Sequence, residues 1–508
     1  MQPIDFFRRR VSSDPDAIAL GAPGQPLTYA ELAAEVDALA AAFQSMDPSR
    51  GSRVGICARN TREHLLAQLA VSAAGKVWIP LNPRNGRAEL DAMIAATRPA
   101  LIVADESCVE SFTPTADPII LGKTVREGAD GRPSVRGLVD RFAGRAPAAV
   151  ERSPDEAQII KFSGGSTGRP KPVVQSLRCI DALVRGILDV FAFDRTDTNL
   201  VAAPLTHGAS CFVLPMLAAG GRHVLLEEPD PRSVLDHFEA YAITTTYLPP
   251  TMIHAMTDEA VARGRFFPHL RHLIYSAAPM SPSRIREAQQ VFGPVVETAY
   301  GQVEAPQIVA AMRASELLLE QNLTSVGRPT RGARVAIMDP DGRLLSTGQT
   351  GEIVVQGDLL MSGYLDLPEL TARTIVDGWL HTGDLGMLDE RGYLHLRGRL
   401  RELINTGGFK VSPADVEAVL ARHPAVAECC VFGVADPKWG EAVHVAVLLT
   451  AGASATESDL IAFVKSELDS VKAPKRVHIV GELPRTPAGK ISRHAVRAMV
   501  LGEDGPGH

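Results

Sequence analysis

"FSGGSTGRPKPVVQS", residues 162–176, combines glycines, small hydroxyl side chains and one lysine in a short stretch. Glycine lets backbone N–H groups turn towards an anion, a hydroxyl can donate to a phosphate oxygen, and lysine supplies positive charge. These features predict a phosphate-binding loop, with a flexible surface loop as the alternative. The candidate phosphate-binding residues are Ser163, Gly164, Gly165, Ser166, Thr167, Gly168 and Lys171.

The loop matches neither of two common phosphate-binding motifs. A GxxxxGK[ST] loop has its lysine directly after glycine at the start of a helix, whereas Arg169 and Pro170 separate Gly168 from Lys171 here. The pattern GxGxxG is also absent. Because the loop lies between the apolar runs AQIIKF and PVVQS, we expect it to join two extended segments.

The composition is that of an ordinary globular protein. The chain has 508 residues, enough for about two to four domains. A net charge of −7 argues against a general nucleic-acid binder but allows an anionic small ligand at a local basic site. The six cysteines form no CxxC pair, and no apolar run approaches the roughly 18 residues of a membrane span. We therefore expect a cytoplasmic protein with reduced thiols and no transmembrane segment.

Helical and extended patterns alternate along the first part of the chain. Residues 28–45 have helical periodicity, with Thr28 and Glu31 at the spacing of a capping box. HLIYSAAP (272–279) and VVETAYG (295–301) look like strands that end at small residues, and such ends line ligand crevices in open α/β sheets.

After about residue 325 the strand character increases. RVAIMDPDGRLL (334–345) carries an Asp-Gly turn signal between apolar runs, which predicts a hairpin. Residues 402–508 follow a helix, strand, strand, helix pattern. We expect an α/β multi-domain fold: a large N-terminal domain of layered α/β sheets with a β-rich subdomain, and a small mobile α+β C-terminal domain.

Together with six further stretches in the same order, the opening loop resembles the adenylate-forming superfamily of acyl- and aryl-CoA synthetases, peptide-synthetase adenylation domains and firefly luciferase. Pro172 and Arg401 depart from the family pattern. The six stretches are PLTHG (204–208), SAAP (276–279), AYGQVEA (299–305), GWLHTGDLG (378–386), GRLRELINTGGFKVSPADVE (398–417) and PRTPAGKISR (484–493).

The resemblance implies a two-step reaction. A carboxylate attacks the α-phosphate of ATP, pyrophosphate leaves, and the CoA thiol then displaces AMP. ATP, Mg²⁺ and CoA are the implied cofactors and co-substrates. The implied domains are 1–400, with the ATP and carboxylate site, and 402–508, with the catalytic lysine, joined by a hinge at Arg401.

The resemblance also assigns residues to the nucleotide and the metal. Glu304 and Thr167 would hold Mg²⁺, Asp384 would accept the ribose hydroxyls, and Arg399 would support the ribose or phosphate. Each has a simpler alternative in the sequence: a solvated acid for Glu304, a turn-forming residue for Asp384 and a core tyrosine for Tyr300. Around adenine and the phosphates the expected residues are Ala278, Pro279, Ala299, Tyr300, Gly301 and Gln302.

Lys490 is the implied catalytic residue of the first step, together with Thr167 and Glu304. Its ammonium would bridge the substrate carboxylate and the α-phosphate and cancel their repulsion. Gly407, Gly408 and Trp439 are candidates for CoA binding, since glycines without side chains would leave room for a pantetheine arm. The acyl pocket is expected to include His207, Tyr247, Ser276, Ala277, Ala299 and Gln302.

The sequence thus predicts an ATP-dependent carboxylate–CoA ligase for an aryl or fatty acid. A close alternative loads the phosphopantetheine of a carrier protein, although PLTHGASC lacks the aspartate with which adenylation domains hold an amino group. A catalytically silent nucleotide-binding scaffold and a luciferase-like oxygenase are less favoured. We expect small-molecule partners only, without nucleic acid, and a homodimer is an assembly to be tested.

Overall fold

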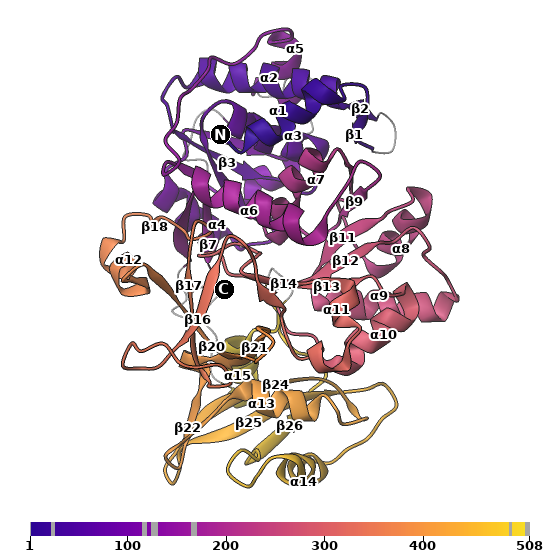
Figure 1. Ribbon diagram of the computed structural model, residues 1–508, viewed down its shortest axis with the longest axis vertical. Helices are drawn as coiled ribbons and strands as arrows, with labels where there is room; N and C mark the ends of the chain where they lie inside the picture. Colours follow the sequence, from indigo (N-terminus) through magenta and orange to yellow (C-terminus); the bar gives the residue numbers. More distant parts are fainter. Residues whose placement is uncertain are drawn as a thin grey trace.

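Two large sheets and two smaller ones organise the chain. The computed structural model describes residues 2–21, 26–113, 119–122, 131–163, 170–486 and 490–502. Helices and strands alternate through its N-terminal part, so the expected α/β multi-domain class is confirmed. Figure 1 shows the C-terminal segment, in yellow, as a separate unit at the lower end, beneath the orange β-rich part.

The largest sheet contains the strands whose ends are predicted to line the ligand crevice. Its central strands β9 to β13 run parallel, so their carboxyl ends meet at one edge. The strands in spatial order are β15 (Arg328–Pro329), β14 (Ala310–Met312), β13 (Val296–Tyr300), β12 (His272–Tyr275), β11 (Thr245–Leu248), β9 (Thr198–Val201), β10 (Arg222–Leu225), β1 (Ile18–Leu20) and β2 (Leu27–Thr28).

The second sheet carries the phosphate-loop hairpin. Its strands β7 and β8 are antiparallel neighbours, which confirms that the opening loop joins two extended segments. In spatial order the strands are β18 (Gly363–Tyr364), β8 (Lys171–Ser176), β7 (Ala157–Ser163), β4 (Val77–Leu81), β3 (Arg53–Cys57), β5 (Leu101–Ala104) and β6 (Ile119–Leu121).

The main hydrophobic core joins the two large sheets through the helices between them. These are α1 (Ile4–Ser13), α2 (Tyr29–Met46), α3 (Arg62–Ala73), α6 (Leu177–Phe191) and α7 (Val213–Ala219). Thr28 and Glu31 form the predicted capping box at α2. Other helices of this part are α4 (Arg87–Thr97), α5 (Val135–Arg141), α8 (Pro231–Ala240), α9 (Pro250–Arg263), α10 (Pro282–Phe292) and α11 (Ala314–Leu317).

The β-rich subdomain is a five-stranded sheet. The predicted turn at Asp341–Gly342 forms, but β16 pairs mainly with β17, and only an isolated bridge joins Met338 to Leu344. The predicted hairpin is thus present in a short form, in which the Asp339 N–H donates to the Arg343 carbonyl and the Leu345 N–H donates to the Ile337 carbonyl. Its elements are β16 (Arg334–Met338), β17 (Gly351–Gln356), α12 (Pro368–Thr374), β19 (Ile375–Val376), β20 (Trp379–Leu388) and β21 (Leu394–Arg399).

A short helix, η4 (Leu400–Glu402), separates this sheet from the C-terminal unit, which has its own core. The expected helix, strand, strand, helix order is present. The elements are β22 (Ile404–Thr406), β23 (Phe409–Val411), α13 (Pro413–Leu420), β24 (Val426–Asp436), β25 (Gly440–Leu449), α14 (Glu457–Glu467), β26 (Arg476–Ile479) and α15 (Arg493–Leu501). Throughout the described ranges, no helix has the length and apolar character needed to cross a bilayer.

Candidate active site

The carboxyl ends of β11, β12 and β13 supply the predicted crevice. Tyr247 lies on β11, Ser276 follows β12, and Tyr300 ends β13. Ala277 has φ of 76°, a conformation that costs energy for a residue other than glycine. Such strain is typical of functional turns, and here it lies within the predicted SAAP segment.

Asp384 is held by three side chains. Its Oδ2 accepts hydrogen bonds from the Tyr300 hydroxyl at 2.7 Å and from the Gln302 amide at 2.5 Å. Arg399, opposite Asp384 in the β20–β21 ladder, places its Nε 3.0 Å from Oδ1. Asp384 is buried within β20, so the alternative of a turn-forming aspartate is wrong.

Tyr300 is therefore a hydrogen-bond donor rather than only a core residue. Burial raises its pKa well above the ordinary value, and the nearby Asp384 carboxylate raises it further. The hydroxyl stays protonated at neutral pH and orients Asp384. The Gln302 amide also donates to the Thr382 carbonyl, so this side chain is directed to the Asp384 side of the crevice.

Glu304 is half-buried, which rules out a freely solvated acid. Its Oε1 accepts a hydrogen bond from the Tyr364 hydroxyl at 2.9 Å, and its backbone carbonyl accepts one from Met361. Mg²⁺ is usually bound through one or two carboxylates together with water and substrate phosphates. The single carboxylate of Glu304 is consistent with this mode of binding. Among the residues with described side chains, no cluster of three metal-ligating groups is present.

The β7–β8 hairpin, which carries the predicted phosphate loop, is connected to the segment that contains Glu304. Ser163 and Lys171 are opposite each other at the open end of the β7–β8 pair. β18, which carries Tyr364, pairs with β8, and the Gln175 side chain donates to the Val303 carbonyl at 2.8 Å. The loop residues Gly164, Gly165, Ser166, Thr167 and Gly168 lie outside the described residues.

Lys490 faces this site from the C-terminal unit. Burial of its ammonium and the positive charge of Arg399 lower its pKa, while Asp384 acts in the opposite direction. The residue as a whole is exposed. The lysine is thus close enough to Asp384 and Arg399 for charge interactions.

His207 is neutral in its surroundings. Burial is the main cause that lowers its pKa to about 4, and the charges of Lys161, Lys490 and Arg84 lower it further. Its Nδ1 lies 2.9 Å from the Thr206 hydroxyl. At the adjoining Gly208, a Cβ would lie 2.4 Å from the Tyr247 hydroxyl oxygen. A larger residue there would displace the Tyr247 side chain.

Other predicted acyl-site and adenine-site residues lie at the same strand ends. Tyr247 is linked by hydrogen bonds to Ser276 and Gln307, and Ala299 is buried on β13. Ala278 and Pro279 follow β12 and reach the surface in part, with Gly301 directly after β13.

Gly407 and Trp439, both predicted to bind CoA, lie against each other. Its φ is 57°, and a Cβ there would lie 2.9 Å from the indole ring of Trp439, whose carbonyl accepts from the Gly407 N–H. The missing side chain therefore lets the Trp439 ring, another predicted CoA-binding residue, lie against Gly407. Gly408 has nothing within 4 Å of a Cβ position and remains open. Trp439 is 38% exposed and lies beneath the ammonium of Lys438.

Sequence reasoning missed Tyr364, Lys161 and Arg84. Tyr364 stands alone in the short segment MSGYLD, where nothing signals a partner 60 residues away. Lys161 could have been singled out from the sequence, because it is a charged residue within the apolar run AQIIKF.

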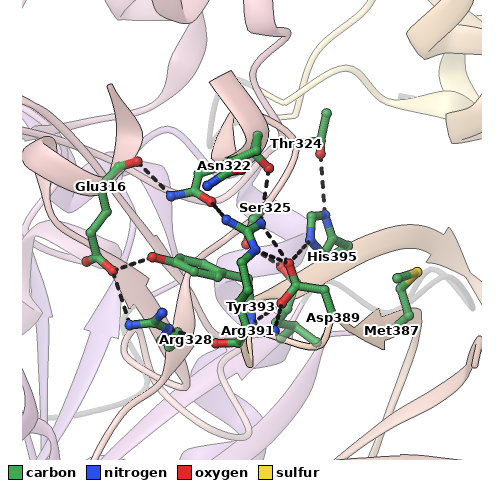
Figure 2. Close-up of polar contacts among 12 residues, drawn as sticks. Glu316, Asn322, Thr324, Ser325, Arg328, Met387, Asp389, Arg391, Tyr393 and His395 are labelled. Atoms are coloured by element: carbon green, nitrogen blue, oxygen red, sulfur yellow. Dashed lines mark hydrogen bonds and ion pairs between the residues drawn. The ribbon is translucent and has the colours of Figure 1, made fainter. Parts of the chain in front are cut away.

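A polar network fixes the turn between β20 and β21, the hairpin that carries Asp384 and Arg399 (Figure 2). Asp389 accepts from the backbone N–H groups of Arg391 and Tyr393 and pairs with the Arg391 guanidinium at 2.7 Å. The Tyr393 hydroxyl donates to Glu316. The network thus connects the hairpin to α11, the helix that contains Glu316.

Comparison with known proteins assigns the chain to a family. The AMP-binding enzyme model matches residues 7–365, and the AMP-binding enzyme C-terminal domain model matches residues 415–490. The chain belongs to the AMP-binding enzyme family. These enzymes form the adenylate-forming superfamily that the sequence resembles, so that expectation is confirmed.

Individual relatives agree with this assignment. The medium/long-chain-fatty-acid–CoA ligase FadD8 of Mycobacterium tuberculosis is 34% identical, covering 93% of this chain and 85% of the relative. A feruloyl-CoA synthase of Amycolatopsis sp is 33% identical, covering 96% and 97%. The amide bond synthetase McbA of Marinactinospora thermotolerans superposes with a TM-score of 0.88 at 30% identity, covering 98% and 100%. The protein is an AMP-forming acid–thiol ligase, and ATP and CoA are substrates of CoA ligases in this family.

Proposed function

We propose that this AMP-binding enzyme activates an aryl or fatty acid as its adenylate and passes the acyl group to CoA, using the residues assembled above. The observation that carries the proposal is the Asp384–Arg399 pair, held by Tyr300 and Gln302, with Lys490 of the C-terminal unit near enough for its charge to act on the pair. The names of the fatty-acid and feruloyl relatives support the substrate class.

Asp384 accepts the ribose hydroxyls in this proposal. Tyr300 and Gln302 keep its carboxylate fixed, so little reorganisation is needed when the nucleotide binds. Tyr300, Ala278 and Pro279 flank adenine, and Lys171 with the loop 163–168 holds the phosphates.

Glu304 would hold Mg²⁺ with Thr167, and the ion would neutralise charge that builds on the phosphate oxygens. Tyr364 donates to one oxygen of Glu304 and restricts the rotation of its side chain. Lys490 holds the substrate carboxylate and the α-phosphate together, because a positive charge between two anions removes their repulsion.

The C-terminal unit, residues 402–508, would then rotate about Arg401 so that the thiol reaches the adenylate. Trp439 and the open side of Gly408 would receive CoA, with Lys438 near the ring as a charge for a phosphate. His207, Tyr247, Ser276, Ala277 and Ala299 would line the acyl pocket.

Lys490→Ala tests the assignment. We expect it to remove most adenylate formation, measured as acid-dependent pyrophosphate release, by about a hundredfold or more, since an electrostatic contact with the developing charge is lost. Thioester formation from added acyl-adenylate should persist. Lys465→Ala, which changes an exposed lysine on α14 of the same unit, is the control. Equal loss of both half-reactions in Lys490→Ala would contradict the role.

The acceptor is tested separately. Product analysis with CoA, a phosphopantetheine-bearing carrier protein and a simple amine should show acyl-CoA as the main product. A clear preference for the carrier protein would favour the alternative of carrier loading.

Assembly and location complete the proposal. A homodimer and a cytoplasmic location are proposed, the latter because all six cysteines are free and four of the five fully buried ones lie in the hydrophobic cores. Light scattering and cell fractionation test the two statements.

A further inference from the structure

Lys161 is a buried lysine beside the acyl site. It lies on β7, two residues before Ser163, and is only 8% exposed. Its Nζ donates to the His207 carbonyl at 3.1 Å and to the Ser210 hydroxyl at 2.8 Å. The ammonium also lies 5.7 Å from the centre of the Trp78 ring. These contacts place the Lys161 ammonium next to the segment 204–210.

The chain contains a second buried lysine for comparison. Lys76 is 1% exposed and is neutralised by the Asp47 carboxylate at 3.2 Å, with the Asp47 carbonyl and the Ser52 hydroxyl as further acceptors. Lys161 has no carboxylate within ion-pair distance among the residues that the structure describes. A buried charge without a counterion is costly, so a structural lysine would be expected to resemble Lys76.

One neighbour of Lys161 is a hydrogen-bond donor without a partner. The indole N–H of Trp78 is buried and donates to no acceptor in the described structure. A region with an unused donor and unneutralised positive charge is complementary to a ligand that brings oxygen acceptors.

We propose that Lys161 is a specificity-determining residue that selects carboxylic acids carrying a second oxygen acceptor, a carbonyl, hydroxyl or carboxylate, on the part of the molecule remote from the reacting carboxylate. This inference rests on the proposed function, because it assigns the acyl site to the segment 204–210. The remaining N–H of the Lys161 ammonium would donate a hydrogen bond to this acceptor, and a carboxylate acceptor would also supply the negative charge that the described neighbours of Lys161 lack.

The experiment uses pairs of acids matched in length. Hexanoate is compared with 5-oxohexanoate and adipate, and 3-phenylpropanoate with 3-(4-hydroxyphenyl)propanoate, by acid-dependent pyrophosphate release. The wild type should prefer the acceptor-bearing member of a pair by about tenfold or more in kcat/KM, because binding sites with polar groups reject analogues that leave those groups unpaired. Lys161→Met should bring the ratio near one, mainly through the KM of the acid.

Lys161→Gln keeps hydrogen bonding without charge and serves if Lys161→Met folds poorly. Lys76→Met is the matched control: it should lower the unfolding temperature and leave the ratio unchanged. An unchanged ratio in both Lys161 variants, or a rise in the KM of ATP with no change between acids, would overturn the proposal. Either result would make Lys161 a positioning residue for the 204–210 segment or the phosphates.

Equilibrium binding separates this inference from the proposed function. Calorimetric titration of the same acids requires no catalysis and therefore remains informative if no acid is adenylated. Tighter binding of the acceptor-bearing acid to the wild type than to Lys161→Gln supports the inference. Equal binding of both members of every pair by the wild type refutes it, whatever the enzyme catalyses.

Discussion

Asp384 is a carboxylate whose geometry depends on its neighbours. Tyr300 and Gln302 both donate to one oxygen, while Arg399 approaches the other. Hydrogen bonds to a charged group contribute about 1.5–3 kcal/mol each, so the loss of one should be measurable in nucleotide binding.

Tyr300→Phe removes one of these donors without changing the ring. We expect the KM of ATP to rise about tenfold, since one charge-assisted hydrogen bond is lost. Tyr275→Phe is the control, because Tyr275 is a buried tyrosine on the neighbouring β12 that bonds to Thr298. Steady-state kinetics would decide: the same change in both variants would mean that Asp384 does not depend on Tyr300.

Lys490 should make the rate of the first half-reaction fall at alkaline pH. Its pKa is lowered from the ordinary value of 10.5, chiefly by burial, so the ammonium loses its proton at a lower pH than a free lysine. Because the charged form is required, adenylation should fall as pH rises through this lowered pKa. Lys490→Arg should retain charge and show a flat profile at reduced rate. A wild-type rate that stays constant up to the pKa of free lysine would count against the role. His207, with its pKa near 4, should add no limb close to neutral pH.

At the scale of elements, the β20–β21 hairpin carries Asp384 and Arg399, which we propose bind the nucleotide, at one end and the Asp389 turn at the other. Burial alone would raise the pKa of Asp389, but hydrogen bonds from Tyr393, Arg391 and His395 lower it to about 2. The carboxylate therefore remains charged and keeps the turn closed over the physiological range.

Asp389→Ala should loosen this hairpin. We expect a loss of about 1–3 kcal/mol in the free energy of unfolding, from donors left without their acceptor, together with a higher KM for ATP. Asp339→Ala is the matched control, since Asp339 caps a turn in the same sheet by accepting from Asp341 and Arg343. Denaturant unfolding and kinetics should show lower stability in both variants and altered ATP binding only in Asp389→Ala.

At the scale of the whole molecule, the proposed function requires two positions of the C-terminal unit, one for each step. Lys490 is near enough to Asp384 and Arg399 for charge interactions, which is the position that the proposed adenylation role requires. Arg401 is exposed within η4, between the last strand of one sheet and the first strand of the next. A backbone rotation there would turn the whole unit at once.

Arg401→Pro should restrict that rotation, because proline fixes φ near −65°. We expect pyrophosphate release to be retained and thioester formation from added acyl-adenylate to fall about tenfold or more, a magnitude typical of losing a gating motion. Arg401→Ala removes the charge but leaves the backbone free to rotate. It therefore separates the effect of the lost charge from the effect of restricted rotation. Normal thioester formation in Arg401→Pro would place the hinge elsewhere.

Local features of this protein were readable in its sequence. The strand, loop, strand order around residues 162–176, the capping box of α2 and the α+β pattern after residue 402 all appear as predicted, because periodicity and turn chemistry act over a few residues. The hairpin predicted at 334–345 also forms in a short version, although β17, which follows it in the chain, supplies most of the pairing of β16.

The sequence by itself determined the fold class, the family and the segments that carry polar chemistry. Only the tertiary structure decided which side chains meet: Tyr364 with Glu304, Trp439 with Gly407, and Lys161 with the carbonyl of His207. Each pair joins residues far apart in the chain, and no local propensity specifies their contact. The packing of sheets and helices around shared cores brings them together, and with them the charges that the reaction requires.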